Sequence, residues 1–287
     1  MFKRNTLCRY SLEVGFIYGL RLLTAIAAVV VLFIVGFLIV EAWPVLRQIA
    51  VSRFLRDQSW HPVSGQYNLL PMIIGTSSVT FGAMLLAVPF GLASGIFCQY
   101  YAPDWLARIY RRLIELLAGI PSVVYGFWGL VVLVPLIGQV HPPGPSLLAG
   151  ILILALMIMP TIALITDSSL ATVPARYLWG AQALGLSRWG IVRGVALPAA
   201  RSGILAGIVL ALGRAIGETM AVLMVCGNVV QVPDSLFAPV RTLTANMALE
   251  MAYATDLHRS ALFVSGLVLM GCIGVLVFVA DQVGRYG

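Results

Sequence analysis

Residues 204–225 read ILAGIVLALGRAIGETMAVLMV, an almost wholly apolar run that holds one basic and one acidic side chain. A run of about 20 apolar residues has the length of a membrane-spanning helix. Arg214 and Glu218 stand four residues apart within it. A charge at bilayer depth costs about 2.5 kcal/mol or more, so such residues pair with one another, line a water-filled path, or do both. The run therefore indicates a membrane transport protein with an anion path.

The composition of the whole chain extends this interpretation. The 287 residues are 60% hydrophobic and only 10% charged, whereas a soluble domain carries about 25% charged residues. We expect an all-α, polytopic membrane protein with six transmembrane helices. The predicted spans are residues 22–40, residues 260–280, and segments within 69–97, 116–137, 147–166 and 202–228.

The distribution of basic residues predicts the orientation. With both termini in the cytoplasm, twelve Lys and Arg residues fall inside and five outside, as the positive-inside rule requires. This topology explains the net charge of +7 without a nucleic-acid partner. The first apolar run exceeds a signal-peptide core of roughly 7–15 residues, so we expect a retained span.

Missing motifs exclude several kinds of chemistry. Lys3 is the single lysine, so the chain has neither a P-loop nor a Schiff-base lysine in its body. The histidines, His61, His141 and His258, lie far apart in predicted external loops without ligand spacing, which predicts no metal site. The four cysteines form no C-x-x-C pair and read as packing residues. We expect no catalytic residues and no cofactor, and any ATP hydrolysis must occur on another subunit.

The third predicted span contains helix-breaking residues. Gly119, Pro121 and Ser122 interrupt an otherwise apolar stretch. Either the helix is broken beside a cavity, or it has a proline kink held by neighbouring helices. Ser122 can offer its hydroxyl to a passing anion or cap freed backbone groups.

Two acidic residues lie near the predicted inner ends of spans. We expect Glu115 to pair with Arg111 or Arg112 across one helical turn. Asp167 reads as a helix-boundary charge that faces water.

Small residues recur every four positions in the fifth span, and such rows let helices approach closely in lipid. One row is Gly203, Gly207, Ala211, Ala215 and Thr219, and a second is Gly213, Gly217 and Ala221. On a continuous helix Arg214 and Glu218 share a face beside these rows. They either form a self-contained ion pair, or Arg214 attracts an anion while Glu218 holds the guanidinium or exchanges with the substrate. The planar fork of arginine suits phosphate-like anions.

Three segments resemble known transport proteins. Residues 184–198, LGLSRWGIVRGVALP, resemble the Glu-Ala-Ala loop of bacterial ABC-importer permeases. Together with residues 115–135 and 213–228, they resemble the PstC-type permease of the phosphate ABC importer. The likeness extends from about residue 61 to the end of the chain.

This resemblance implies a type I ABC-importer permease in the cytoplasmic (inner) membrane that carries inorganic phosphate. Such a subunit pairs with a second permease, binds two cytoplasmic ATPase subunits and receives phosphate from an external binding protein. The positions of Arg214 and Glu218 are implicated in phosphate passage in that family. The region of Gly185 matches a coupling helix, with the glycine at a turn between two short helices, and Pro198 matches the start of a new helix.

One part of the loop departs from the family pattern. Trp179 stands where the family has Glu, while Gly180 and Ala181 take the two alanine positions. A glycine in place of alanine weakens a helix by roughly 1 kcal/mol. We therefore expect an altered contact with the ATPase and an unchanged fold.

The expected organisation is a cytoplasmic amino end (1–19), a first helix with an external segment (20–68), a core permease domain (69–283) with a cytoplasmic coupling loop (168–201), and a cytoplasmic end (284–287). The alternatives to phosphate import are a permease for another oxyanion, such as molybdate or sulfate, and an ATP-independent anion channel. An intramembrane enzyme would need a nucleophile and base at bilayer depth, and Ser122 has no histidine near it in the sequence.

Overall fold

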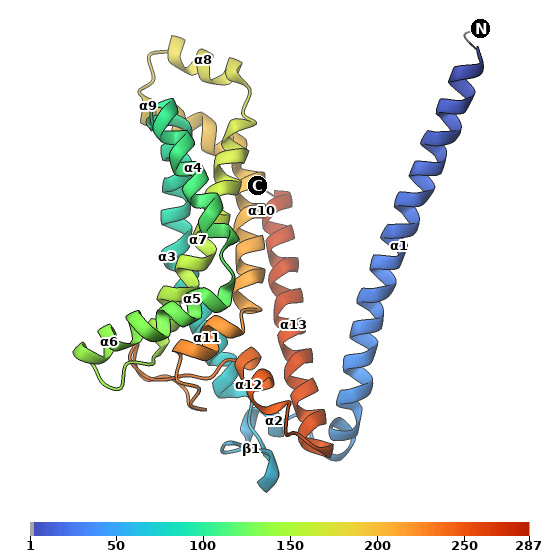
Figure 1. Ribbon diagram of the computed structural model, residues 1–287, viewed down its shortest axis with the longest axis vertical. Coiled ribbons are helices and arrows are strands. Elements are labelled where there is room, and N and C mark those ends of the chain that lie inside the picture. Colours follow the sequence, from blue (N-terminus) through green and yellow to red (C-terminus); the bar gives the residue numbers. More distant parts are fainter. Residues whose placement is uncertain (1–2, 287) are drawn as a thin grey trace.

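The computed structural model describes the backbone of residues 3–286 and the side-chain burial of residues 16–279 and 282. Most of this part is helical (Figure 1). The α-helices are α1 (Lys3–Gln48), α2 (Arg53–Arg56), α3 (Leu70–Ile96), α4 (Asp104–Gly119), α5 (Ser122–Trp128), α6 (Val134–Val140), α7 (Leu147–Ala171), α8 (Ala175–Ala183), α9 (Arg188–Ile191), α10 (Leu197–Ile216), α11 (Met220–Val225), α12 (Leu243–Glu250) and α13 (Asp256–Tyr286). The other elements are strands β1 (Trp60–His61) and β2 (Gln66–Tyr67), the 3-10 turn η1 (Pro62–Ser64), and the π-helical turns η2 (Phe97–Tyr101), η3 (Gly129–Leu133) and η4 (Val192–Ala196).

Six helical stretches in the described residues are long and apolar enough to cross a membrane, which confirms the predicted number. They are Phe16–Gln48, Leu70–Tyr101, Ser122–Val140, Leu147–Ala171, Arg188–Ile216 and Asp256–Val279.

Helix α7 packs against both α3 and α10 and supplies much of the core. It is apolar on every side, and Ile153, Met157 and Ile158 are fully buried, as expected for a helix enclosed by others. The first small-residue row of α10 makes the contact with α7, because a methyl group added at Gly207 would lie 2.7 Å from the side chain of Ile165. The predicted close approach of helices along this row is confirmed.

Helix α1 stands apart from the bundle over most of its length and meets α13 only near its carboxyl end (Figure 1). There the rings of Phe37 and Phe263 pack edge to face with centroids 5.7 Å apart, and Ala42 and Val45 are fully buried. The helix continues through Pro44 to Gln48, so it also takes up the first part of the predicted external segment.

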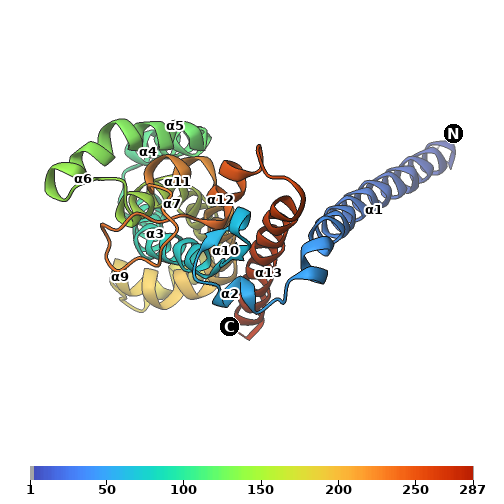
Figure 2. The same ribbon diagram turned by 90° about the horizontal axis from the view of Figure 1, so that it is seen from below.

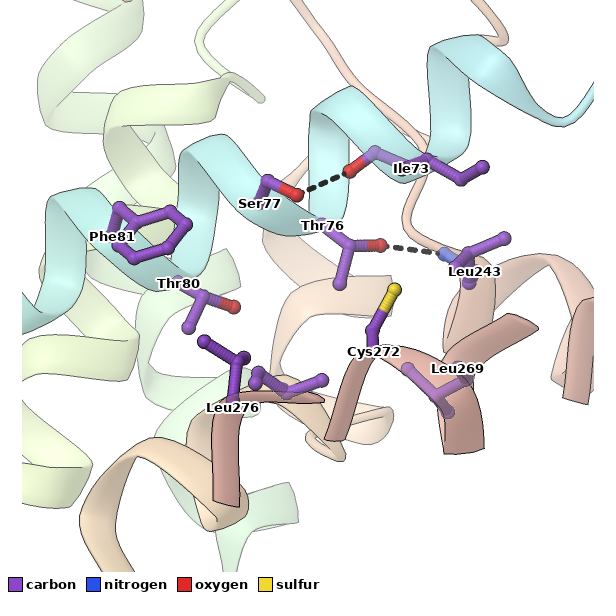
Figure 3. Close-up of a pocket in the computed structure, with 10 residues that line it drawn as sticks. Ile73, Thr76, Ser77, Thr80, Phe81, Leu243, Leu269, Cys272 and Leu276 are labelled. Atoms are coloured by element: carbon purple, nitrogen blue, oxygen red, sulfur yellow. Dashed lines mark hydrogen bonds between the residues drawn. The ribbon is translucent and has the colours of Figure 1, made fainter. Parts of the chain in front are cut away.

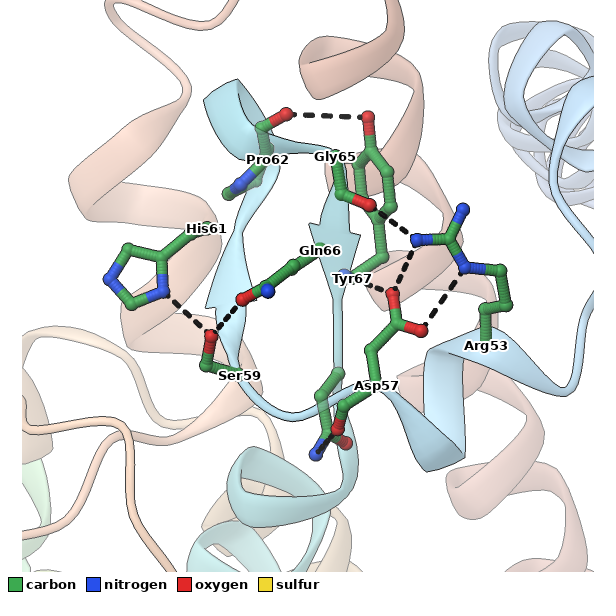
Figure 4. Close-up of polar contacts among 9 residues, drawn as sticks. Arg53, Asp57, Ser59, His61, Pro62, Gly65, Gln66 and Tyr67 are labelled. Carbon is green, nitrogen blue, oxygen red and sulfur yellow. Dashed lines mark hydrogen bonds and ion pairs between the residues drawn. The ribbon is translucent and has the colours of Figure 1, made fainter.

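The rest of that segment departs from an all-helical chain, because β1 and β2 pair as a small antiparallel hairpin. Asp57 accepts two hydrogen bonds from Arg53, at 3.1 and 3.0 Å, and one from the Tyr67 N–H at 2.9 Å (Figure 4). Desolvation raises the pKa of Asp57, but the hydrogen bonds from Arg53 and Tyr67 outweigh it, so this pKa lies below its ordinary value. These contacts give the hairpin a fixed shape.

The third predicted span is a broken helix, which confirms the first of its two interpretations. Helix α4 ends at Gly119, Ile120 and Pro121 are extended, and α5 begins at Ser122. Helix α4 runs alongside α7, whereas α5 and α6 lie across the bundle (Figures 1 and 2). The break thus turns the chain by a large angle between its two halves.

The two ends of the molecule carry different segments. The amino end of α1, the carboxyl end of α13 and the segment from α8 to α9 point toward one end, and α2, the hairpin and α12 lie toward the other (Figure 1). This arrangement agrees with an even number of spans.

Candidate functional site

The fifth span is interrupted between its two charged residues, so the prediction of one continuous helix is wrong. Helix α10 ends at Ile216 and α11 begins at Met220. At the end of α10, the Gly217 N–H donates to Gly213 O and the Glu218 N–H donates to Ala215 O, each at 3.3 Å. Hydropathy does not reveal this break, because the sequence on both sides of it is equally apolar.

The break separates Arg214 from Glu218, which form no ion pair within the described part of the chain. The self-contained pair, and a Glu218 that holds the guanidinium, are therefore both wrong in this structure. The Glu218 carboxylate instead accepts a hydrogen bond of 3.1 Å from the Ala221 N–H at the start of α11. A carboxylate in this position caps a helix and favours the positive end of its dipole.

Arg214 is exposed at the carboxyl end of α10. Its nearest polar partner is Thr161 of α7, with Nη1 donating to Oγ1 over 3.4 Å, a long hydrogen bond. The guanidinium therefore lies on a face that this chain leaves uncovered.

The two helix breaks meet in space, because α5 packs against α11. At this contact a methyl group added at Gly126 would lie 2.8 Å from Ala221 Cα. Tyr125 Oη donates to Leu117 O over 2.9 Å, a carbonyl of the last turn of α4 that also accepts from the Ile120 N–H, and so links the two sides of the first break. Ser122 is half-buried at the start of α5, and its contact with a passing anion stays a prediction.

The segment from α8 to α10 has the predicted shape. Gly185 has φ +74°, a left-handed conformation that glycine adopts without strain. The Gly185 N–H donates to Gln182 O and the Leu186 N–H donates to Ala181 O, at 2.9 and 3.2 Å, which is a Schellman termination of α8. The turn between two short helices is thus confirmed.

Helix α10 has Pro198 in its first turn, where a missing N–H costs little. The chain is nevertheless helical without interruption from Arg188, since α9 passes through the π-helical turn η4 into α10. The sequence predicts that Pro198 starts a new helix. In the structure Pro198 instead follows a π-helical turn within one continuous helical stretch.

Large apolar side chains are exposed on this coupling segment (residues 175–191). Trp179 is 67% exposed and Leu184 is 82% exposed, while Gly180 has no atom near its missing side chain. A cluster of exposed apolar groups at the end of a protein marks an interaction surface.

An ion pair that sequence reasoning missed joins α4 to α7. Arg111 binds both oxygens of Asp167, at 2.7 and 2.9 Å. The hydrogen bonds to Asp167 raise the pKa of Arg111, against desolvation, which lowers it. Asp167 is thus paired and largely shielded, so the prediction that it simply faces water is wrong. Glu115 forms no ion pair in the described residues, against expectation.

A second polar cluster, at the end of the molecule that carries the hairpin, surrounds Glu250, which is 8% exposed. One carboxylate oxygen accepts from Arg241 at 2.8 Å, and the other contacts Trp60 Nε1 at 2.8 Å and His258 Nε2 at 2.9 Å. Trp60 and Glu250 are 190 residues apart, so no local pattern could have revealed the cluster.

Within the described residues, no group of three or more acidic, histidine or cysteine side chains could hold a metal ion.

Comparison with known proteins identifies the family to which this architecture belongs. Residues 87–284 match the family described as the binding-protein-dependent transport system inner membrane component. The phosphate transport system permease protein PstC of Mesorhizobium japonicum is 38% identical over 92% of this chain and 87% of its own length. The probable ABC transporter permease protein YqgH of Bacillus subtilis is 42% identical over 76% of this chain and 72% of its own.

Among solved structures, an inward-facing form of the MetNI methionine ABC transporter aligns with a TM-score of 0.61 and 20% identity, over 76% of this chain and 95% of that one. A bacterial alginate ABC transporter aligns with a TM-score of 0.61 and 15% identity, over 91% and 94%. The fold is that of type I ABC-importer permeases. With six candidate spans and a family match over most of its length, the chain belongs to the family of binding-protein-dependent transport system inner membrane components.

Proposed function

We propose that this chain is a permease subunit of an ATP-driven importer that carries inorganic phosphate across the cytoplasmic membrane. The observation that carries the proposal is the exposed guanidinium of Arg214 beside a break in a membrane-spanning helix. Permeases of phosphate transport systems among its relatives support the choice of substrate. The chain itself performs no chemistry.

Arg214 suits an oxyanion because its planar fork can donate to two oxygens at once. Within the described part of the chain, its one hydrogen bond is the long contact with Thr161, which leaves its other donors for a ligand. Since its face is uncovered by this chain, we expect a second permease subunit to close the path from the other side. Broken helices at membrane depth are tolerated where they line such a path.

Glu218 has a different role in this proposal. Its carboxylate caps α11 and keeps the break open, so its charge lies near the path without neutralising Arg214. Ser122 begins α5, which packs on α11, and we expect its hydroxyl to contact the anion on the same path.

Movement along the path requires energy from outside the membrane domain. We expect two ATPase subunits, which bind the ATP, to dock on the coupling segment through the exposed Trp179 and Gly180. Ala181 is 5% exposed and so is not available for that contact, while Gly185 shapes the turn and Pro198 follows it. An external phosphate-binding protein delivers the substrate at the opposite end. Both termini then lie in the cytoplasm, which agrees with their position at the same end as the coupling segment (Figure 1).

The test is phosphate uptake by the complete complex in proteoliposomes. We expect ATP-dependent accumulation of labelled phosphate that an excess of unlabelled phosphate abolishes and that molybdate and sulfate do not. Competition by those anions would favour another oxyanion as substrate, and uptake that proceeds without ATP would favour a channel.

Arg214→Ala links the uptake to the site. We expect it to abolish uptake while the protein still inserts and assembles, whereas Arg56→Ala, at an exposed arginine in the predicted external segment, leaves uptake unchanged. Normal uptake by Arg214→Ala would refute the proposed role of the guanidinium.

A further inference from the structure

The segment that follows α11 returns to the helix break and touches it. Thr244, in the first turn of α12, is 4% exposed. Its hydroxyl donates to the main-chain carbonyl of Glu218 over 2.8 Å. Glu218 is therefore bound twice: its carboxylate caps α11, and its main-chain carbonyl accepts from Thr244, 26 positions later in the sequence.

The hydrogen bonds around Thr244 have a single possible direction. Because the Thr244 hydroxyl donates its one hydrogen to Glu218 O, its 3.0 Å contact with the Thr242 hydroxyl must receive a hydrogen from Thr242. Thr242 Oγ1 in turn accepts from the Ala245 N–H at 3.2 Å and caps α12. The hydroxyls of Thr242 and Thr244 each donate their one hydrogen. Removal of the Thr244 hydroxyl therefore leaves the Glu218 carbonyl without its donor and the Thr242 hydroxyl without its acceptor.

Helix α12 is itself fixed to two other parts of the molecule. The Leu243 N–H donates to Thr76 Oγ1 of α3 over 3.0 Å, at the edge of the pocket between α3 and α13 (Figure 3). At the other end of α12, Glu250 binds Arg241, which also donates to Asn228 O over 2.9 Å. Both ends of α12 are thus anchored, and it can act as a rigid support for the break.

We infer that Thr244 is a positioning residue for transport: its hydroxyl holds the Glu218 peptide in place and so sets where α11 lies relative to Arg214. This inference rests on the proposed transport function. It assigns to α12 the task of keeping the two halves of the fifth span in register.

Hydrogen–deuterium exchange on the purified complex tests the contact directly. Thr244→Val keeps the shape of the side chain and removes its donor. We expect exchange of the amides of residues 217–222 to become about ten-fold faster, the factor that corresponds to about 1.4 kcal/mol for one lost buried hydrogen bond. Exchange elsewhere should not change, which separates a positioning role from general destabilisation. Thr244→Ser, which retains the hydroxyl, should behave as the wild type does.

Phosphate uptake gives the functional readout. We expect Thr244→Val to lower the maximal rate by about the same factor with little change in KM, because Arg214 is untouched. The matched control is Thr166→Val, since Thr166 is 1% exposed and its hydroxyl has no partner in the described part of the chain. If Thr244→Val is not recovered from membranes, Thr244→Ala takes its place.

Wild-type exchange and uptake in Thr244→Val would overturn the inference, as would a Thr244→Ser variant that is equally impaired. A wild-type complex that fails to take up phosphate, while the exchange pattern holds, would count against the proposed substrate and leave the role of Thr244 standing.

Discussion

The contact between α5 and α11 gives a quantitative prediction, because it leaves no room for a side chain at Gly126. A methyl group there would lie 2.8 Å from Ala221 Cα, 3.0 Å from Met224 Sδ and 3.3 Å from Met220 O. Two of these three atoms belong to the backbone of α11, which cannot rotate away as a flexible side chain can. Gly126→Ala must therefore move one helix relative to the other.

The expected cost follows from two opposing effects. Overpacking by one methyl group costs about 1–3 kcal/mol, and replacing a helical glycine by alanine returns up to about 1 kcal/mol. We expect a net loss of about 1–2 kcal/mol in the free energy of unfolding. Since Glu218 and Thr244 hold α11 in place, part of the strain should fall on the break, and phosphate uptake should fall as well.

Unfolding of the purified protein in mixed micelles, followed against the fraction of denaturing detergent, measures this difference. The matched control is Gly180→Ala, because Gly180 is also helical but has open space around its missing side chain. That control should be as stable as the wild type or more so, by up to about 1 kcal/mol. A Gly126→Ala protein with undiminished stability and uptake would show that α5 and α11 are not packed as described.

Three further predictions concern single side chains. Arg214→Lys keeps the charge but loses the planar fork, so we expect phosphate uptake with a KM raised by about ten-fold or more; an unchanged KM would mean that charge alone suffices. Trp179→Glu restores the acidic residue usual in the family and should retain or improve ATP-dependent uptake, and loss of ATPase association on pull-down would show instead that the tryptophan contact is specific. For Asp57, the folded-state pKa lies below the usual 3.8, so its contribution to stability is present above that value and is lost as pH falls through the lower one. The protection factors of the hairpin amides, which correct for the intrinsic pH dependence of exchange, should therefore fall below about pH 4, and Asp57→Asn should remove that dependence; identical profiles for the two proteins would refute the assignment.

The sequence was sufficient for features that depend on local composition. The number of spans follows from hydropathy, the contact between α10 and α7 follows from the spacing of small residues such as Gly203 and Gly207, and the turn at Gly185 follows from the need for a left-handed residue. The break at Pro121 was one of two open interpretations, since proline permits either a kink or an interruption.

Features that depend on distant parts of the chain were missed. Helix α10 ends at Ile216, and the peptide of Glu218 beyond it is bound by the side-chain hydroxyl of Thr244. Asp167 meets Arg111 across 56 residues, so neither its pairing nor the lack of a partner for Glu115 could be deduced from spacing along one helix. Arg214 and Glu218 stand four apart in the sequence, which predicts an ion pair. They form none in the structure, because side chains at i and i+4 share a face only on an unbroken helix.

The uninterrupted helical path from Arg188 to Ile216 has a mechanical consequence. The 29 residues follow a helical path that bends between the π-helical turn η4 and α10 (Figures 1 and 2). Helix α10 is the straight part, and Arg214 lies about 25 Å along it from Leu197. If an ATPase docked on the coupling segment tilts α10 by about 5° about its amino end, the guanidinium shifts by about 2 Å. Small motions at the coupling segment would thus make or break the contact of Arg214 with an ion.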